Sequence, residues 1–243
     1  MSFYLTLPSS STRLPERIRL DGEYEVGLAE IAYPHTWYNV DNREGIYWIG
    51  AYNLATNGLI KTFVKSGYYC DGEAFVASLT HQATRTFADI PDISLKLSFV
   101  KHADRIRMQV RNSKEHIVVL SWELMEFLGF REKLIAKKEA DLVASNAFDV
   151  NRGLHLMYVH CDVASHGVVG DVRAPVLRVC NVSGTHGRVV HVTYERPHYV
   201  PVGRREFDTV GITINNEHGD PMPFEFGNLM VTLPVLCDVA DGV

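Results

Sequence analysis

Residues 149–235 have the sequence DVNRGLHLMYVHCDVASHGVVGDVRAPVLRVCNVSGTHGRVVHVTYERPHYVPVGRREFDTVGITINNEHGDPMPFEFGNLMVTLPV. Apolar and polar residues alternate along several short segments of this stretch, which is the period of a β-strand with one buried face. The alternating apolar residues are Val190, Val192 and Tyr194; Val210, Ile212 and Ile214; and Leu229, Val231, Leu233 and Val235. The segments between them are rich in Gly, Asn, Asp and Ser, which favour turns. The stretch therefore predicts five or six short strands and no helix of useful length.

The composition is that of an ordinary globular protein. The chain has 243 residues, of which 46% are hydrophobic and 22% charged, enough for one large β-domain or two small domains. The net charge is -5, so we expect no specific nucleic-acid binding. The N-terminal residues lack the pattern of a signal peptide, and no apolar run reaches the roughly 18 residues of a membrane span. We therefore expect synthesis in the cytosol without translocation. The four cysteines form no Cys-x-x-Cys pair, and we expect them to be reduced.

The N-terminal region also predicts strands. Residues 3–7 form a short apolar strand that ends at a proline, and residues 17–33 form a longer β-like run with a hairpin signal at Asp21-Gly22. The alternation changes phase after Leu28. Either a β-bulge shifts the register there, which we favour, or Glu30 is a partly buried carboxylate with a partner.

The composition changes over residues 46–145, which predict a compact α+β module. Two strands, 46–52 and 59–64, are joined by Asn57-Gly58, and Asp71 is placed to cap a helix with one apolar stripe. That stripe consists of Phe75, Leu79, Ala83 and Phe87. Strands follow at 93–99, 105–111 and 116–120, and a short helix begins after Ser121 and ends at Gly129. Residues 132–145 are a helix or a linker, and the pattern favours the helix.

Residues with reactive or metal-binding side chains do not combine into a catalytic motif. The most suggestive cluster consists of His155, His160, Cys161, Asp162 and His166. A metal site needs several ligands that converge on one point, whereas a strand over residues 154–163 would place these side chains on opposite faces. The chain has no nucleophile elbow, phosphate-binding loop or dinucleotide fingerprint. We therefore expect no enzyme, no metal and no cofactor.

Two prolines, Pro197 and Pro201, frame the extended segment PHYVPV at residues 197–202. Proline has no N–H for a sheet ladder, so this segment must be a sheet edge or a crossover. Two arginines follow it, which are either solvated, the favoured interpretation, or paired with a neighbouring subunit. The candidate subunit-interface residues are Pro197, His198, Tyr199, Pro201, Arg204 and Arg205.

Several segments carry a resemblance to a known family. They are residues 3–9 (FYLTLPS), 20–31 (LDGEYEVGLAEI), Tyr33-Pro34, Trp37, 120–130, Asp149-Val150, Arg152-Gly153, 158–162 (YVHCD), 169–171 (VGD), 175–178 (PVLR), 197–202 (PHYVPV) and 223–227 (PFEFG). In this order, over nearly the whole chain, they resemble the minor capsid (penton) protein of Polinton, or Maverick, elements and adintoviruses. One departure is the short segment Ser10–Arg13, where the family has a longer one, so a first strand or an inter-subunit arm is expected to be shortened.

The resemblance implies a single jelly-roll β-sandwich, interrupted by the α+β module as an insertion. We expect the jelly roll to comprise residues 1–45 and 146–243, and the insertion residues 46–145. The implied function is structural: a homopentamer at the five-fold vertices of an icosahedral virion, beside a double jelly-roll major capsid protein, made in the cytosol of the host. The alternative is a jelly-roll module that binds a ligand or glycan on an aromatic platform of Trp37, Trp48 and Tyr52.

Overall fold

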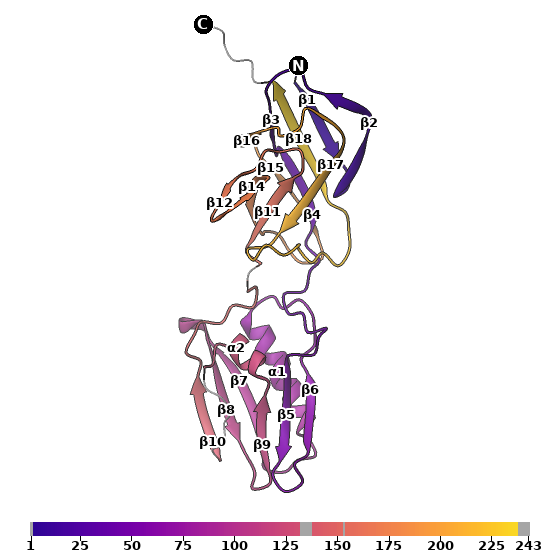
Figure 1. The fold of residues 1–243 in the computed structure, drawn as a ribbon. Helices are drawn as coiled ribbons and strands as arrows, with labels where there is room; N and C mark the ends of the chain where they lie inside the picture. Colours follow the sequence, from indigo (N-terminus) through magenta and orange to yellow (C-terminus); the bar gives the residue numbers. More distant parts are fainter. Residues whose placement is uncertain (1, 132–137, 153, 238–243) are drawn as a thin grey trace. The chain divides into compact units, whose positions relative to one another are not determined.

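The computed structural model describes residues 2–131, 138–152 and 154–237. The chain divides into two compact units, one formed by Met1–Trp37 with Gly153–Val243 and the other by Tyr38–Arg152. The first unit is a β-sandwich, and the second combines strands with two helices (Figure 1).

One sheet of the sandwich contains the first and the last described strands. Its strands are β1 (Phe3–Leu7), β3 (Tyr24–Gly27), β4 (Glu30–Pro34), β15 (Val189–Thr193), β16 (Tyr199–Pro201) and β18 (Met230–Cys237). All pairs are antiparallel: β18 lies between β1 and the β3–β4 segment, while β16 pairs with β3 and β15 with β4. The sheet therefore has four rows, with β1 at one edge and β15 and β16 at the other.

The second sheet has four strands in the order β14-β11-β17-β2. Their bounds are β2 (Ser11–Arg19), β11 (Leu156–Cys161), β14 (Val176–Asn181) and β17 (Glu206–Asn215). A small hairpin of β12 (Gly167–Val169) and β13 (Val172–Ala174) stands apart from both sheets. Along the chain, the eight rows are β1, β2, β3–β4, β11, β14, β15–β16, β17 and β18. The chain crosses from one sheet to the other at each step except between β11 and β14, which are neighbours in the second sheet. This connectivity is that of a jelly roll, so the predicted fold class is confirmed.

The core of the sandwich is built by the predicted alternation. Val210, Ile212 and Ile214 of β17 point inward, as do Val231, Leu233 and Val235 of β18; all six are 5% exposed or less. Residues 149–235 form eight strands rather than five or six. Their short extra strands were missed because Val168 and Val172 of the β12–β13 hairpin are exposed and leave no buried face to detect.

The hairpin predicted at Asp21-Gly22 is wrong. The strands on either side do not pair, since β2 joins β17 in one sheet and β3 joins β18 in the other. Gly22 has a φ of 125°, so the turn is there, but it carries the chain from one sheet to the other. A turn signal specifies local backbone, whereas the burial of the flanking apolar faces decides which strand pairs with which.

The predicted bulge after Leu28 is confirmed. Val26 faces Val235 and Glu30 faces Thr232, so three residues of the β3–β4 segment lie opposite two of β18. Glu30 is also half-buried and accepts a hydrogen bond from Thr232 Oγ1 at 3.1 Å. The β-bulge and the partly buried, hydrogen-bonded Glu30 carboxylate are therefore both present.

The described residues of the unit Tyr38–Arg152 form two three-stranded sheets and two α-helices. One sheet has the order β6-β5-β9, with β5 (Trp48–Asn53), β6 (Leu59–Phe63) and β9 (His116–Leu120). The other has the order β10-β8-β7, with β7 (Ser94–Val100), β8 (Arg105–Arg111) and β10 (Glu139–Val143), and the 3-10 turn η1 (Lys101–Ala103) joins β7 to β8. Helix α1 (Gly72–Thr86) is capped by Asp71 and α2 (Trp122–Phe127) by Ser121, as predicted. Phe75, Leu79, Ala83 and Phe87 are buried.

The favoured helix over residues 132–145 is wrong where the structure describes it. Residues 139–143 form strand β10, paired with β8, while residues 132–137 lie outside the described residues. Ala140 and Leu142 pack against the core, and Asp141 binds the guanidinium of Arg107 across the sheet. The helical propensity of this alanine- and lysine-rich segment is outweighed by sheet pairing.

Candidate assembly surface

The residues suspected of metal chemistry do not converge. His160 and Cys161 are adjacent on β11 and point to opposite faces, and Cys161 is fully buried in the sandwich core. Burial raises the pKa of the Cys161 thiol to about 11 and lowers that of His160. Within the described ranges, no group of three or more His, Cys, Asp or Glu residues is placed to hold a metal ion.

Asp162 has a structural role. Its carboxylate accepts a hydrogen bond from the Gly211 amide at 2.8 Å and lies 3.2 Å from Arg204 Nη1. These contacts connect the end of β11 to the neighbouring β17 and to the segment that leads into it. Arg204 thus has an ion-pair partner in its own chain, which the favoured reading of a solvated arginine missed.

The predicted edge at residues 197–202 is confirmed. β16 pairs with the strand β3 on one side, through Tyr199 with Gly27 and Pro201 with Glu25. On its other side a loop, not a strand, reaches its end, where the Ser165 amide donates to the Pro201 carbonyl oxygen at 2.8 Å. Gly27 makes this approach possible, because a Cβ there would lie 3.1 Å from the His198 carbonyl oxygen. His198 and Pro201 are exposed, whereas Val200 packs on the core. The two prolines leave this edge short of donors, which limits strand addition and leaves side chains as its means of contact.

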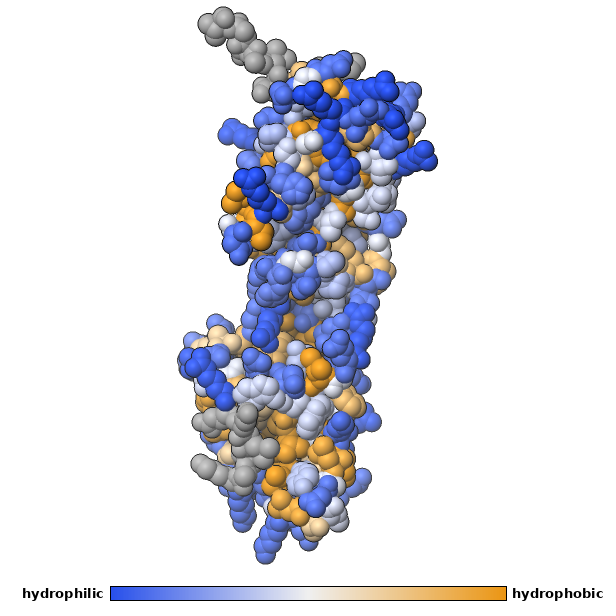
Figure 2. All heavy atoms as spheres, in the orientation of Figure 1, coloured by the Kyte–Doolittle hydropathy of each residue, from blue (hydrophilic) through white to orange (hydrophobic). Residues whose placement is uncertain are grey.

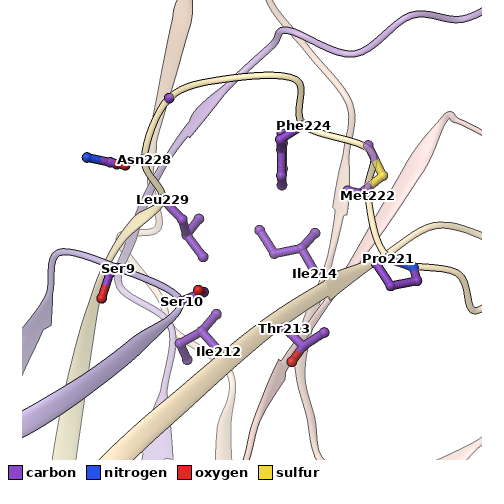
Figure 3. Close-up of a pocket in the computed structure, with 11 residues that line it drawn as sticks. Ser9, Ser10, Ile212, Thr213, Ile214, Pro221, Met222, Phe224, Asn228 and Leu229 are labelled. Atoms are coloured by element: carbon purple, nitrogen blue, oxygen red, sulfur yellow. The ribbon is translucent and has the colours of Figure 1, made fainter.

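A groove lies on the opposite side of the sandwich, where the turn between β1 and β2 meets β17 (Figure 3). Its volume is about 440 Å³. Apolar side chains of β17 and of the loop before β18 point toward a common space, with polar residues around them (Figure 3). The apolar lining residues are Ile212, Ile214, Met222, Phe224 and Leu229; the polar ones are Ser9, Ser10, Thr213 and Asn228.

The loop at residues 216–229 is held by specific contacts. Asn216 Oδ1 accepts hydrogen bonds from the amides of His218 and Asp220, which closes the predicted turn. Thr36 Oγ1 donates to the Phe226 carbonyl oxygen at 2.8 Å. Sequence reasoning missed this groove because its walls come from three segments, none of which carries a motif. The only signal was the alternation of Ile212 and Ile214, which indicated core.

Tyr4 lies on the edge strand β1, on the outer face of the first sheet, and is 70% exposed. The registers lead from Tyr4 through Pro234 and Gly27 to Tyr199 of β16. Burial, with a smaller contribution from Tyr4, raises the pKa of Tyr199. The sandwich has two different edges, β1 with the groove at one and the proline-framed β16 at the other.

The aromatic platform of the alternative prediction is not assembled. Trp37 is 1% exposed, stacked on His35 at 4.1 Å and packed edge-on against Phe224. Trp48 and Tyr52 belong to the other compact unit, where the Lys61 ammonium lies over the Trp48 ring. Trp37 instead anchors its loop on the core, so its ring has no free face for a sugar.

Comparison with solved structures finds chains of similar fold. No protein-family model matches the chain, and no curated protein matches it. The crystal structure of the selenomethionine-labelled penton protein of mavirus has a similar fold, with a TM-score of 0.52 and 11% sequence identity. The similarity covers 96% of this chain and 98% of the mavirus chain. At this identity the likeness is one of fold, and it extends over both the jelly roll and its insertion.

Proposed function

We propose that the protein is the penton, or vertex, subunit of an icosahedral capsid and that it assembles into homopentamers. The observation that carries this proposal is the fold shared with the mavirus penton protein over almost the full length of both chains. A jelly roll alone occurs in proteins of many functions. In this chain the unit Tyr38–Arg152 is inserted between β4 and β11. Because the similarity covers this insertion as well as the sandwich, it is more specific than a similarity of the sandwich alone.

The two unlike sides of the sandwich support a ring. Subunits of a cyclic pentamer meet head to tail, so each must present two different, complementary surfaces. We assign one surface to β1 and the groove, and the other to the β16 edge with Pro197, His198, Tyr199 and Pro201. Arg205 continues this second surface and is exposed, while Arg204 contributes to it from its ion pair with Asp162.

The proposal extends to partners and location. A vertex protein occupies a gap between copies of the major capsid protein, which for a Polinton-like element is a double jelly roll. The protein would then be part of the virion. No helix in the described part of the chain has the length and apolarity to span a membrane. The proposed role is structural, and no enzymatic activity is proposed.

Mass photometry of the purified full chain tests the proposal. We expect a species of five times the 27.4 kDa of one chain, either alone or on addition of the major capsid protein encoded by the same genome. A monomer under every condition, including with that capsid protein, would refute it.

A further inference from the structure

Strand β6 (Leu59–Phe63) has a free edge in the unit Tyr38–Arg152. It pairs with β5 on one side, and no other described strand pairs with it. The Val64 amide donates to the Tyr47 carbonyl oxygen at 2.9 Å, so the backbone groups of Val64 face β5. Because these groups alternate in direction along a strand, the N–H and C=O groups of Leu59, Lys61 and Phe63 face away from β5. They form a row of donors and acceptors for an added strand.

The side chains of β6 are unusually apolar for an exposed edge. Leu59 is 44% exposed, Ile60 54% and Phe63 47%. Figure 2 shows hydrophobic side chains gathered over β5, β6 and β9. Edge strands are normally protected by charges or prolines, and here Lys61 is the one charged residue of the strand. Apolar side chains on both faces of a free edge indicate a surface that a partner covers.

A groove of about 410 Å³ lies between this edge and helix α1. Its lining residues are Thr62, Phe63, Lys65, His81, Gln82, Arg85 and Thr86. Three of them are basic and none of these described residues is a carboxylate, although the chain as a whole carries a net charge of -5. A cationic groove on an acidic protein is complementary to an acidic ligand.

Gln82 gives an independent sign of a missing ligand. Its side chain is 9% exposed, its Nε2 donates to Ser78 Oγ at 3.2 Å, and its Oε1 has no hydrogen-bond partner among the described residues. A buried polar atom without a partner costs stability, so each one calls for an explanation, and a bound ligand is one. Oε1 is an acceptor, so an N–H group of a bound polypeptide would supply the missing bond.

We propose that the β6 edge and its groove bind an extended acidic segment of a partner polypeptide by β-strand addition. The backbone of the added strand pairs with Leu59, Lys61 and Phe63. Its alternate side chains face α1, where Lys65, His81 and Arg85 select carboxylates, and the others lie beside the apolar outer face. All of these residues belong to the unit Tyr38–Arg152, so the inference is independent of pentamer formation.

Fluorescence anisotropy with the full chain tests this inference. The probe is a fluorescein-labelled peptide of eight residues in which Glu and Val alternate, and the matched probe has Gln in place of Glu. We expect the Glu peptide to bind at least tenfold more tightly than the Gln peptide, with an affinity that falls as salt is added. Equal binding of the two peptides, or no binding of the Glu peptide, would overturn the proposal.

Two variants separate strand addition from simple anion binding. Lys61→Pro removes an outward N–H without breaking a bond to β5, and it should weaken peptide binding at least tenfold relative to Lys61→Ala. Arg85→Glu should have a similar effect, whereas Lys96→Glu, the same change of charge on β7, should not. Competition by inorganic sulfate together with normal binding by Lys61→Pro would identify a plain anion site and contradict strand addition. Circular dichroism of each variant reports whether it is folded.

Discussion

Gly227 and Gly219 share a left-handed backbone but have different surroundings. Their φ angles are 97° and 88°, and both lie in the loop that closes the apolar groove. A Cβ at Gly227 would lie 2.7 Å from Pro34 Cβ, whereas one at Gly219 would meet nothing within 4 Å. Gly219→Ala should therefore cost only the backbone strain, about 1 kcal/mol, and Gly227→Ala about 1–3 kcal/mol more. Chemical denaturation measures both, and equal losses would contradict this account of the Gly227 contact.

The thiols should differ sharply in reactivity. Cys161 is buried and Cys70 is exposed. Burial raises the pKa of Cys161 to about 11, so its reactive thiolate is scarce at pH 8. Brief alkylation of the native protein at pH 8, followed by mass spectrometry, should modify Cys70 and leave Cys161 intact. Rapid modification of Cys161 would show that the sandwich core opens under native conditions.

The same raised pKa predicts a loss of stability in alkali. The unfolded chain releases the Cys161 proton near pH 9 and the folded chain near pH 11, so the folded state holds the proton more tightly. This tighter binding of the proton stabilises the folded state fully below pH 9. As the pH rises toward 11, the free energy of unfolding should fall by on the order of 2 kcal/mol. Urea denaturation of Cys161→Ala should show a shallower decline over this range than the parent protein. Parallel declines would mean that another group is responsible.

At the scale of elements, α1 depends on its first residue. Asp71 is the N-cap, its carboxylate accepts from the Ala74 amide at 2.8 Å, and this hydrogen bond lowers the pKa of Asp71. Asp71→Ala should lower the free energy of unfolding by about 1 kcal/mol, whereas Asp71→Asn keeps an acceptor and should cost much less. Thermal unfolding of the two variants distinguishes them.

Elements with a strong local signal were predictable. The turn at Asn57-Gly58, the caps Asp71 and Ser121 and the end of α2 at Gly129 each follow from the conformation that one residue prefers. The predictions of a helix in place of β10 and of a hairpin at Asp21-Gly22 were wrong for the opposite reason. Their structure depends on which distant strand lies alongside, and no local preference encodes that choice.

At the scale of the whole molecule, the ends of the insertion meet. The Asn39 side chain donates to Asn151 Oδ1 at 2.9 Å and to the Tyr69 carbonyl oxygen at 2.8 Å. We therefore predict that residues 38–152, produced alone, fold as an independent domain. Nuclear magnetic resonance should show dispersed signals that overlay on those of the full chain. A collapsed spectrum would mean that the insertion needs the jelly roll.

The two sides assigned to the pentamer contact make a further prediction. Ser10→Glu, at the groove, damages one side and His198→Glu the other, so each variant alone should fail to form rings. Mixed together, the intact side of one variant can bind the intact side of the other, and mass photometry should detect complexes of two chains but no pentamers. Unimpaired pentamers from either variant would show that the contact lies elsewhere.

The sequence by itself determined the β-rich character of the chain, the strand faces, the helix caps and the sheet edge at Pro197 and Pro201, because each depends on neighbouring residues. The tertiary structure alone decided which strands pair, how the first and the last described strands share one sheet, and where the two grooves lie. These features join residues that are more than 200 positions apart, such as Ser9 with Leu229. Their physical basis is the burial of apolar faces contributed by distant segments, which no local pattern records.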